Sequence, residues 1–254
     1  LDIPLRDALV AAIPRIAGRF AGNPRLEGVV RRELSESLYM AGAREEGVAQ
    51  GKLAFETLEK ELGRSDVDAL DARLHLARLR LARDDTETAH RMYQEGIASL
   101  PPDAPRSLRL GYEVGLAGAD VEMQQEERAI ATLKRLLPET EAEFRMLQEV
   151  HLDAVDHLMR ALSQLSRNRE ALDLAHRTRV EAERLHGPDD ALSARWIERE
   201  SIMLRVMERF DEALPLARRA YDSARKRLGE GHANTQSPRM QLAALLLDME
   251  RPAE

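Results

Sequence analysis

Small residues recur along this chain at a nearly constant interval, and this regularity constrains the fold more than any other feature of the sequence. Five turns are each followed by an acidic residue and then a small one, at spacings of 42, 40, 42 and 42: Gly47, Ala89, Ala129, Ala171 and Ala213. A second series lies twelve positions earlier: Ser35, Ala77, Ala117, Met159 and Ser201, continued by Ala243. Two helices approach to about 8 Å only where a small side chain lies at their crossing. The sequence therefore predicts a series of helix pairs, with Met159 making the fourth pair the least regular.

The composition supports an all-α fold, because the commonest residues, Ala, Leu, Arg and Glu, are strong helix formers and aromatic residues make up only 4%. We expect about twelve antiparallel helices. The first helices of the pairs are expected at about 25–42, 67–83, 105–121, 140–165, 189–207 and 235–249. The second helices are expected at about 2–20, 44–62, 86–100, 125–138, 168–185 and 210–229.

The short turn followed by an acidic residue, Ala and Leu (Glu170-Ala171-Leu172 and Glu212-Ala213-Leu214) resembles the tetratricopeptide repeat (TPR) family. The 42-residue period and the Leu-Gly endings at Gly63 and Gly229 resemble its kinesin light chain-like subclass. This resemblance implies a right-handed solenoid whose first helices line a concave binding groove. The opening segment, residues 5–47, is also similar to the entry of TPR regions in bacterial signalling and transcription regulators, where a winged-helix or kinase domain precedes the repeats.

The expected organisation is a single solenoid over 1–254 that forms part of a longer chain, because its pattern begins on a second helix and ends on a first helix. The expected repeat units are 1–22, 23–64, 65–103, 104–138, 139–187, 188–231 and 232–254. The compartment stays open: periplasmic if the repeats are attached to a membrane-linked regulator, and otherwise cytoplasmic.

Composition and motifs argue against several classes of function. The net charge of −7 disfavours direct nucleic-acid binding, and no apolar run is long enough to enter a membrane. The chain has no cysteine, no Gly-rich phosphate loop and no HxxxH or HExxH pattern, so we expect no cofactor, no metal and no enzymatic activity.

Several conspicuous residues have structural interpretations. Gly111, Gly115 and Gly118 share one helical face, which indicates a close helix crossing or a kink, with exposed backbone for a ligand as the alternative. The loop histidines His186 and His232 are expected to cap helices. Four methionines at helical spacing are expected to fill the core: Met203, Met207, Met240 and Met249. Trp196 is expected to be buried, although an exposed groove position would make it a binding hot spot.

A candidate groove follows from projecting each first helix from its small residue. The projected residues are Arg32, Glu36, Asp71, His75, Arg78, Asp153, Asp156, His157, Arg160, Arg195, Glu198 and Arg199. The pattern His-x-x-Arg at His75 and Arg78 recurs at His157 and Arg160, and alternating Arg and His would suit a peptide carboxylate or another anion. Alternatively, these charges only solvate an open groove or pair with neighbouring carboxylates.

The sequence therefore predicts a sensor or interaction domain that binds a peptide, a protein or a small effector in this groove. The alternative is a structural scaffold that associates with itself.

Overall fold

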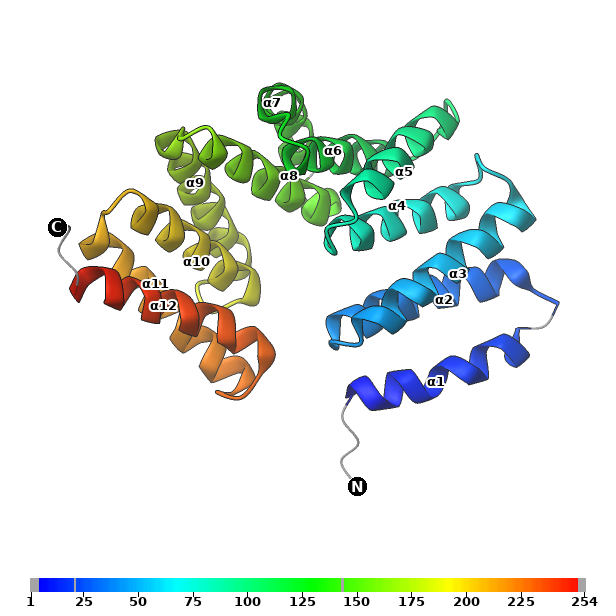
Figure 1. Cartoon of the computed structure of the whole chain (residues 1–254), viewed down its shortest axis with the longest axis horizontal. Helices are drawn as coiled ribbons and strands as arrows, with labels where there is room; N and C mark the ends of the chain where they lie inside the picture. Colours follow the sequence, from blue (N-terminus) through cyan, green and yellow to red (C-terminus); the bar gives the residue numbers. More distant parts are fainter. Residues whose placement is uncertain (1–4, 21, 143, 251–254) are drawn as a thin grey trace. The chain divides into compact units, whose positions relative to one another are not determined.

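The computed structural model describes residues 5–20, 22–142 and 144–250, and within them it contains helices and no strands (Figure 1). The first helices of the pairs are α2 (Pro24–Met40), α4 (Val67–Leu81), α6 (Arg106–Glu122), α8 (Phe144–Gln164), α10 (Ala191–Val206) and α12 (Ala233–Glu250). The second helices are α1 (Leu5–Arg19), α3 (Arg44–Leu62), α5 (Thr86–Ser99), α7 (Glu126–Ala142), α9 (Asn168–His186) and α11 (Phe210–Leu228). The prediction of an all-α fold with twelve helices is confirmed, and most helix ends fall within two residues of the expected positions.

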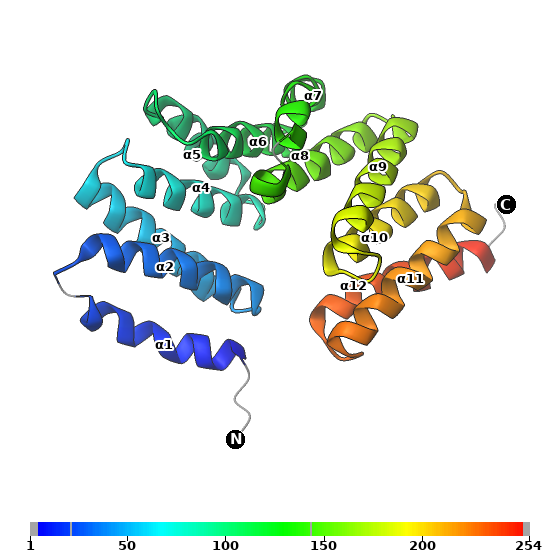
Figure 2. The same ribbon diagram turned by 180° about the vertical axis from the view of Figure 1, so that it is seen from behind.

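The chain divides into two compact units, Leu1–Ala154 and Val155–Glu254, with the boundary inside α8. In the first unit each helix from α1 to α6 packs on the next as an antiparallel neighbour, and in the second unit each helix from α9 to α11 does so (Figures 1 and 2). That all the pairs form one continuous solenoid stays a prediction.

The helix crossings lie at the small residues, as expected. Ser35 of α2 donates a 2.7 Å hydrogen bond from Oγ to the carbonyl oxygen of Gly47 in α3. Ser201 of α10 makes the same bond, 3.1 Å long, to the carbonyl oxygen of Ala213 in α11. A methyl group on Gly47 would come within 2.9 Å of the Ser35 carbonyl oxygen, so only a small side chain allows this approach.

The backbone conformation of the short turns also repeats along the chain. One residue with positive φ lies a few positions before each of the second helices α3, α5, α7, α9 and α11: Gly42 (88°), Asp84 (62°), Gln124 (59°), Ser166 (57°) and Glu208 (59°). These residues have the same 42, 40, 42 and 42 spacing as the small residues. Each lies in the left-handed region, which ends a first helix and reverses the chain.

The longer loops use a recurrent side-chain cap. Asp66, Asp190 and His232 occupy the same repeat position, and each accepts a hydrogen bond from the backbone N–H two residues later, at 2.9, 2.9 and 3.1 Å. A side-chain acceptor here satisfies one of the free N–H groups of the first helical turn. The expected capping role of His232 is confirmed.

Two helix boundaries near the middle of the chain differ from the expectation. Helix α7 continues through Pro138 to Ala142, and α8 therefore begins at Phe144 rather than near 140. Proline removes one helical hydrogen bond, but Leu133, Leu136 and Thr140 on this helix are fully or almost fully buried. Burial of this face outweighs the lost bond, which is why the proline does not end the helix.

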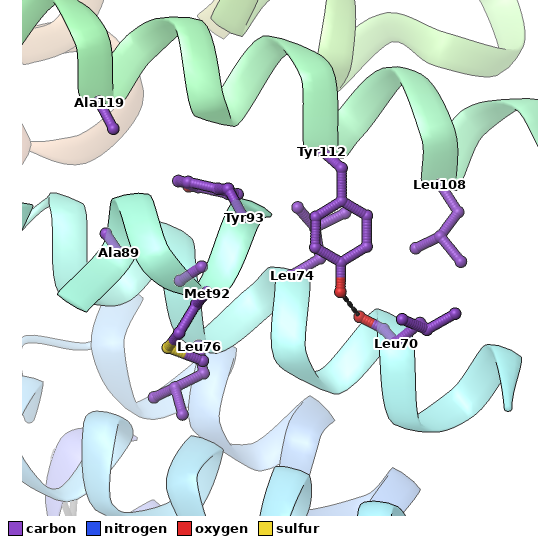
Figure 3. Close-up of a cluster of buried hydrophobic side chains, with 10 residues drawn as sticks. Leu70, Leu74, Leu76, Ala89, Met92, Tyr93, Leu108, Tyr112 and Ala119 are labelled. Atoms are coloured by element: carbon purple, nitrogen blue, oxygen red, sulfur yellow. Dashed lines mark hydrogen bonds between the residues drawn. The ribbon is translucent and has the colours of Figure 1, made fainter. Parts of the chain in front are cut away.

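The core of the first unit is built around two tyrosines (Figure 3). The Tyr93 ring of α5 lies over Gly115 of α6, and the Tyr112 ring of α6 lies over Gly96 of α5. The rings meet edge to face, with centroids 6.4 Å apart. Gly111 similarly accommodates Leu74. The close helix crossing predicted from the glycines is confirmed.

Candidate functional site

The projected groove residues all lie on the first helices α2, α4, α8 and α10, and seven of them line three hollows. Asp71 and Arg78 line a hollow in the first unit. Two further hollows lie in the second unit, one lined by Asp156, Arg160 and Arg199 and another by Arg195 and Glu198. Arg32, Glu36, His75, Asp153 and His157 line none of these three hollows.

The hollow of the first unit has a volume of about 310 Å³ and lies between α4, α6 and the start of α8. Its arginine is already engaged, because Arg78 donates a 2.8 Å bond to Glu149 and lies 3.7 Å from Asp153. Arg32 of α2 similarly lies 3.0 Å from Asp71. Burial raises the pKa of Asp71, while the positive charges of Arg32 and Arg78 oppose that rise. In this part of the groove the arginine side chains thus form ion pairs with neighbouring carboxylates.

His75 is part of the helix crossing rather than a free surface group. Its Nε2 lies 2.9 Å from Ser35 Oγ, whose single hydrogen is directed to Gly47. His75 is therefore the donor, as a neutral imidazole protonated on Nε2. Burial, together with Arg32 and Arg78, lowers the pKa of His75 to about 4. The imidazole stays uncharged at neutral pH and contributes no positive charge to the groove.

The hollow between α8 and α10 has a different character. Its volume is about 230 Å³, and apolar side chains form much of its wall: Met159, Ile202, Met203 and Val206. Arg160 is exposed at the same hollow, and Arg199 is 41% exposed. An apolar wall beside guanidinium groups can accommodate an apolar side chain and an anion at once.

Asp156 organises the charges of this second hollow. Only 13% of its side chain is exposed, and it accepts a hydrogen bond from Arg195 and forms an ion pair with Arg199, whose Nε lies 3.1 Å from the carboxylate. Of these two arginines, Arg199 lines the hollow together with Arg160. Two guanidinium groups and one carboxylate are therefore present at the hollow.

The sequence analysis missed some lining residues of the hollow in the first unit and of the hollow between α8 and α10. Ile202 lies on the projected stripe of α10, but only polar residues were selected from it. Val206 and Glu149 were missed because the projection ended four residues after and began six residues before each small residue.

Of the other conspicuous residues, Trp196 is fully buried, so the expected packing role is confirmed. Met203 is also buried, but Met240 is 66% exposed, and its assignment to the core is wrong. Met240 lies on a face of α12 that no neighbouring helix covers, which helical spacing alone could not reveal.

Among the described residues, no group of three or more His, Cys, Asp or Glu side chains is arranged to hold a metal ion. Over the same residues, no helix has the length and apolar character needed to cross a membrane.

No known protein family matches the sequence, and no curated protein matches it either. Solved structures do match. BtubC (BKLC) from P. vanneervenii superposes with a TM-score of 0.63 at 18% identity, covering 82% of this chain and 85% of that chain. The nearly identical TPR-like repeats described as a kinesin light chain of Podosopora anserina give a TM-score of 0.58 at 18% identity, covering 82% of this chain and 99% of that chain. This chain therefore has a TPR-like helical-repeat fold.

Proposed function

We propose that this chain is a non-enzymatic interaction domain that binds a segment of a peptide or protein partner, and that the hollow between α8 and α10 is its main contact. The observation that carries the proposal is an apolar wall beside the guanidinium groups of Arg160 and Arg199, with Arg199 ion-paired to Asp156. A TPR-like fold supports it, because stacked helix pairs present extended surfaces to a partner.

The side chains that line the hollow indicate which residues the bound segment of the partner should contain. The guanidinium groups of Arg160 and Arg199 at this hollow are suited to bidentate contacts with a carboxylate, either a side chain or a chain terminus. Ile202 and the half-exposed Val206 offer an apolar surface beside them. We therefore expect a segment in which a large apolar residue lies next to a carboxylate.

The test is selection from a random peptide library displayed with free carboxyl termini, followed by calorimetry on synthetic peptides. We expect enrichment of apolar residues beside a carboxylate. Substitution of Arg199→Ala or Arg160→Ala should weaken binding by about tenfold, the cost of a charge-assisted contact. The matched control is Arg177→Ala, which removes an exposed arginine from the second helix α9.

Equal loss of affinity in the Arg177→Ala protein would show that only bulk charge matters and would overturn the site. Enrichment of basic peptides would overturn the assignment of the ligand class. Circular dichroism melts should coincide for all the variants, because none of these side chains is buried.

The role of such a domain in bacterial signalling or transcription control, coupled to a winged-helix or kinase domain, is the broader part of the proposal. It rests on the resemblance of the opening segment to TPR regions of bacterial regulators. The complete reading frame of the gene tests it, because it shows whether a winged-helix or kinase domain is encoded in the same chain.

A self-associating scaffold is the second candidate, and the exposed apolar residues Met240, Leu246 and Leu247 on α12 favour it. Light scattering after size exclusion decides between the two, because a monomer at tens of micromolar excludes the scaffold.

A further inference from the structure

A second helix packs between two first helices, and the residues that make this contact keep fixed positions in the repeat. The crossing residue of α3, Gly47, faces Ser35 of α2. Four positions further on, a methyl group on Gly51 would meet both Ser35 of α2 and His75 of α4. The crossing residue and the residues 4, 7 and 11 positions after it are all buried in α3, α7, α9 and α11. This face is therefore the one that a second helix buries between its two neighbours.

Helix α1 has the same face, and it is entirely apolar. The four positions, 42 residues before those of α3, hold Leu5, Leu9, Ala12 and Ile16. In the described part of the chain α1 packs on α2 (Figure 1). Ile16 is buried, but Leu9 and Ala12 are only half-buried, and Leu5 is 70% exposed. One neighbour thus covers part of this face, and the part at the crossing residue is open.

Helix α12 presents the matching face of a first helix. Its crossing residue is Ala243, which is exposed, whereas the crossing residues of α2, α4, α6, α8 and α10 are all buried. Leu246 lies three positions on and is 38% exposed. The leucines at this position in α2, α8 and α10 are at most 4% exposed: Leu38, Leu162 and Leu204. Within the described residues α12 packs on α11 and α10. The side that other first helices turn towards their second helix is therefore open in α12.

We propose that α1 of one copy of this chain packs on α12 of another copy, as a second helix packs on its first helix, so that copies associate head to tail. In this register Leu5 of α1 lies opposite Ala243 of α12. A large residue opposite a small one fits the repeat, because the crossing positions of α8 and α9 hold Met159 and Ala171, both buried. Covering the exposed leucines of both helices removes apolar surface from water, which favours association.

The two faces differ from each other, so this contact is heterologous. A copy that is bound through α12 keeps its own α1 face available for the next copy, and association can continue beyond a dimer. The inference rests on the second candidate function, self-association, and gives it an interface. It does not involve the side chains of the hollow between α8 and α10, so peptide binding and association are compatible in one chain.

Sedimentation equilibrium of the whole chain at increasing concentration measures the association. We expect the weight-average mass to rise from 28.6 kDa to more than twice this value. Leu5→Glu and Leu246→Glu each place a charge where the contact would bury it, so each variant alone should remain monomeric. Val180→Glu is the matched control, because Val180 is a 46% exposed apolar residue of α9 outside both faces. It should associate as the unchanged chain does.

The decisive sample is an equimolar mixture of the Leu5→Glu and Leu246→Glu variants. The first variant keeps an intact α12 face, and the second keeps an intact α1 face. The mixture should therefore form heterodimers and nothing larger. A contact between two α12 faces predicts a different result, in which the Leu5→Glu variant associates as well as the unchanged chain.

An unchanged chain that stays monomeric at several hundred micromolar overturns both the inference and the scaffold. Association that Leu5→Glu leaves intact, or a mixture that stays monomeric, overturns the head-to-tail contact and leaves the scaffold standing. Loss of association in Val180→Glu also overturns the assignment of the two faces. Far-ultraviolet circular dichroism should coincide for all the variants, because the substituted side chains are exposed. Arg199→Ala should leave association unchanged, so failure of the peptide site is distinguishable as well.

Discussion

Glu200 of α10 accepts a 2.5 Å hydrogen bond from Nε of Arg179 in α9. Glu200 also lies 2.9 Å from Nδ1 of His176, and only 7% of the residue is exposed. The corresponding position holds leucine in five of the other first helices, for example Leu76 and Leu158. An ion pair thus replaces an apolar contact between α9 and α10.

Because Glu200 is buried, Glu200→Ala should destabilise the second unit by about 3 kcal/mol, since it removes one of the two carboxylates that bind the Arg179 guanidinium and leaves Glu183. Glu200→Leu restores the residue type of the other repeats and should cost less. Urea unfolding followed by the fluorescence of Trp196, the only tryptophan, measures both. Asp222→Ala, at an exposed position of α11, is the control. An alanine variant as stable as the unchanged chain would mean that the ion pair does not hold these helices.

The repeat itself could be predicted from the sequence, because a helix crossing needs a small residue and Ser35, Gly47, Ser201 and Ala213 show this need directly. The ends of helices followed from turn residues such as Gly63 and Gly229. Burial of individual side chains did not follow, as Met240 shows, because it depends on which helix lies opposite. The sequence also did not predict which side chains pair across the groove. The ion pairs of Asp156 with Arg195 and Arg199 depend on side-chain conformations that helical spacing does not determine.

The left-handed turn residues predict a stabilising substitution. Ser166 and Glu208 have φ of 57° and 59°, a conformation that costs a residue with a Cβ about 1 kcal/mol relative to glycine. Ser166→Gly and Glu208→Gly should therefore each raise the free energy of unfolding by up to about 1 kcal/mol, partly offset by the greater freedom of glycine in the unfolded chain. Urea titration measures the change. Arg218→Gly, in the middle of α11, should instead lower stability by about 1 kcal/mol, and destabilisation by all three substitutions would contradict the assigned turn conformation.

Stability should fall in mild acid. Burial lowers the pKa of His75 and of His151 from 6.5 to about 4. The unfolded chain then binds more protons than the folded chain between pH 6.5 and 4, so protonation favours unfolding in that window. The loss should begin as pH falls through about 6.5 and reach up to about 3 kcal/mol for each histidine near pH 4.

Urea unfolding followed by circular dichroism from pH 7.5 to 4.5 measures this dependence. His75→Gln keeps a donor for Ser35 but does not titrate, so it should reduce the loss of stability in acid and leave the part that comes from His151. An unchanged profile in that variant would show that His75 is not responsible.

The contact between Gly96 and Tyr112 predicts a specific coupling. A methyl group on residue 96 would lie 1.9 Å from the Tyr112 ring, so Gly96→Ala should destabilise the first unit by about 2 kcal/mol through overpacking. Gly231→Ala is the matched control, because nothing lies within 4 Å of a methyl group there, and it should be nearly neutral. Tyr112→Leu loses the ring and the bond to Leu70, but it also removes the atoms that the new methyl group would meet. The double variant Gly96→Ala with Tyr112→Leu should therefore be more stable than the sum of the two losses, by about 1 kcal/mol or more. If urea titrations show that the two losses are additive, the packing of the Tyr112 ring does not require the absence of a side chain at residue 96.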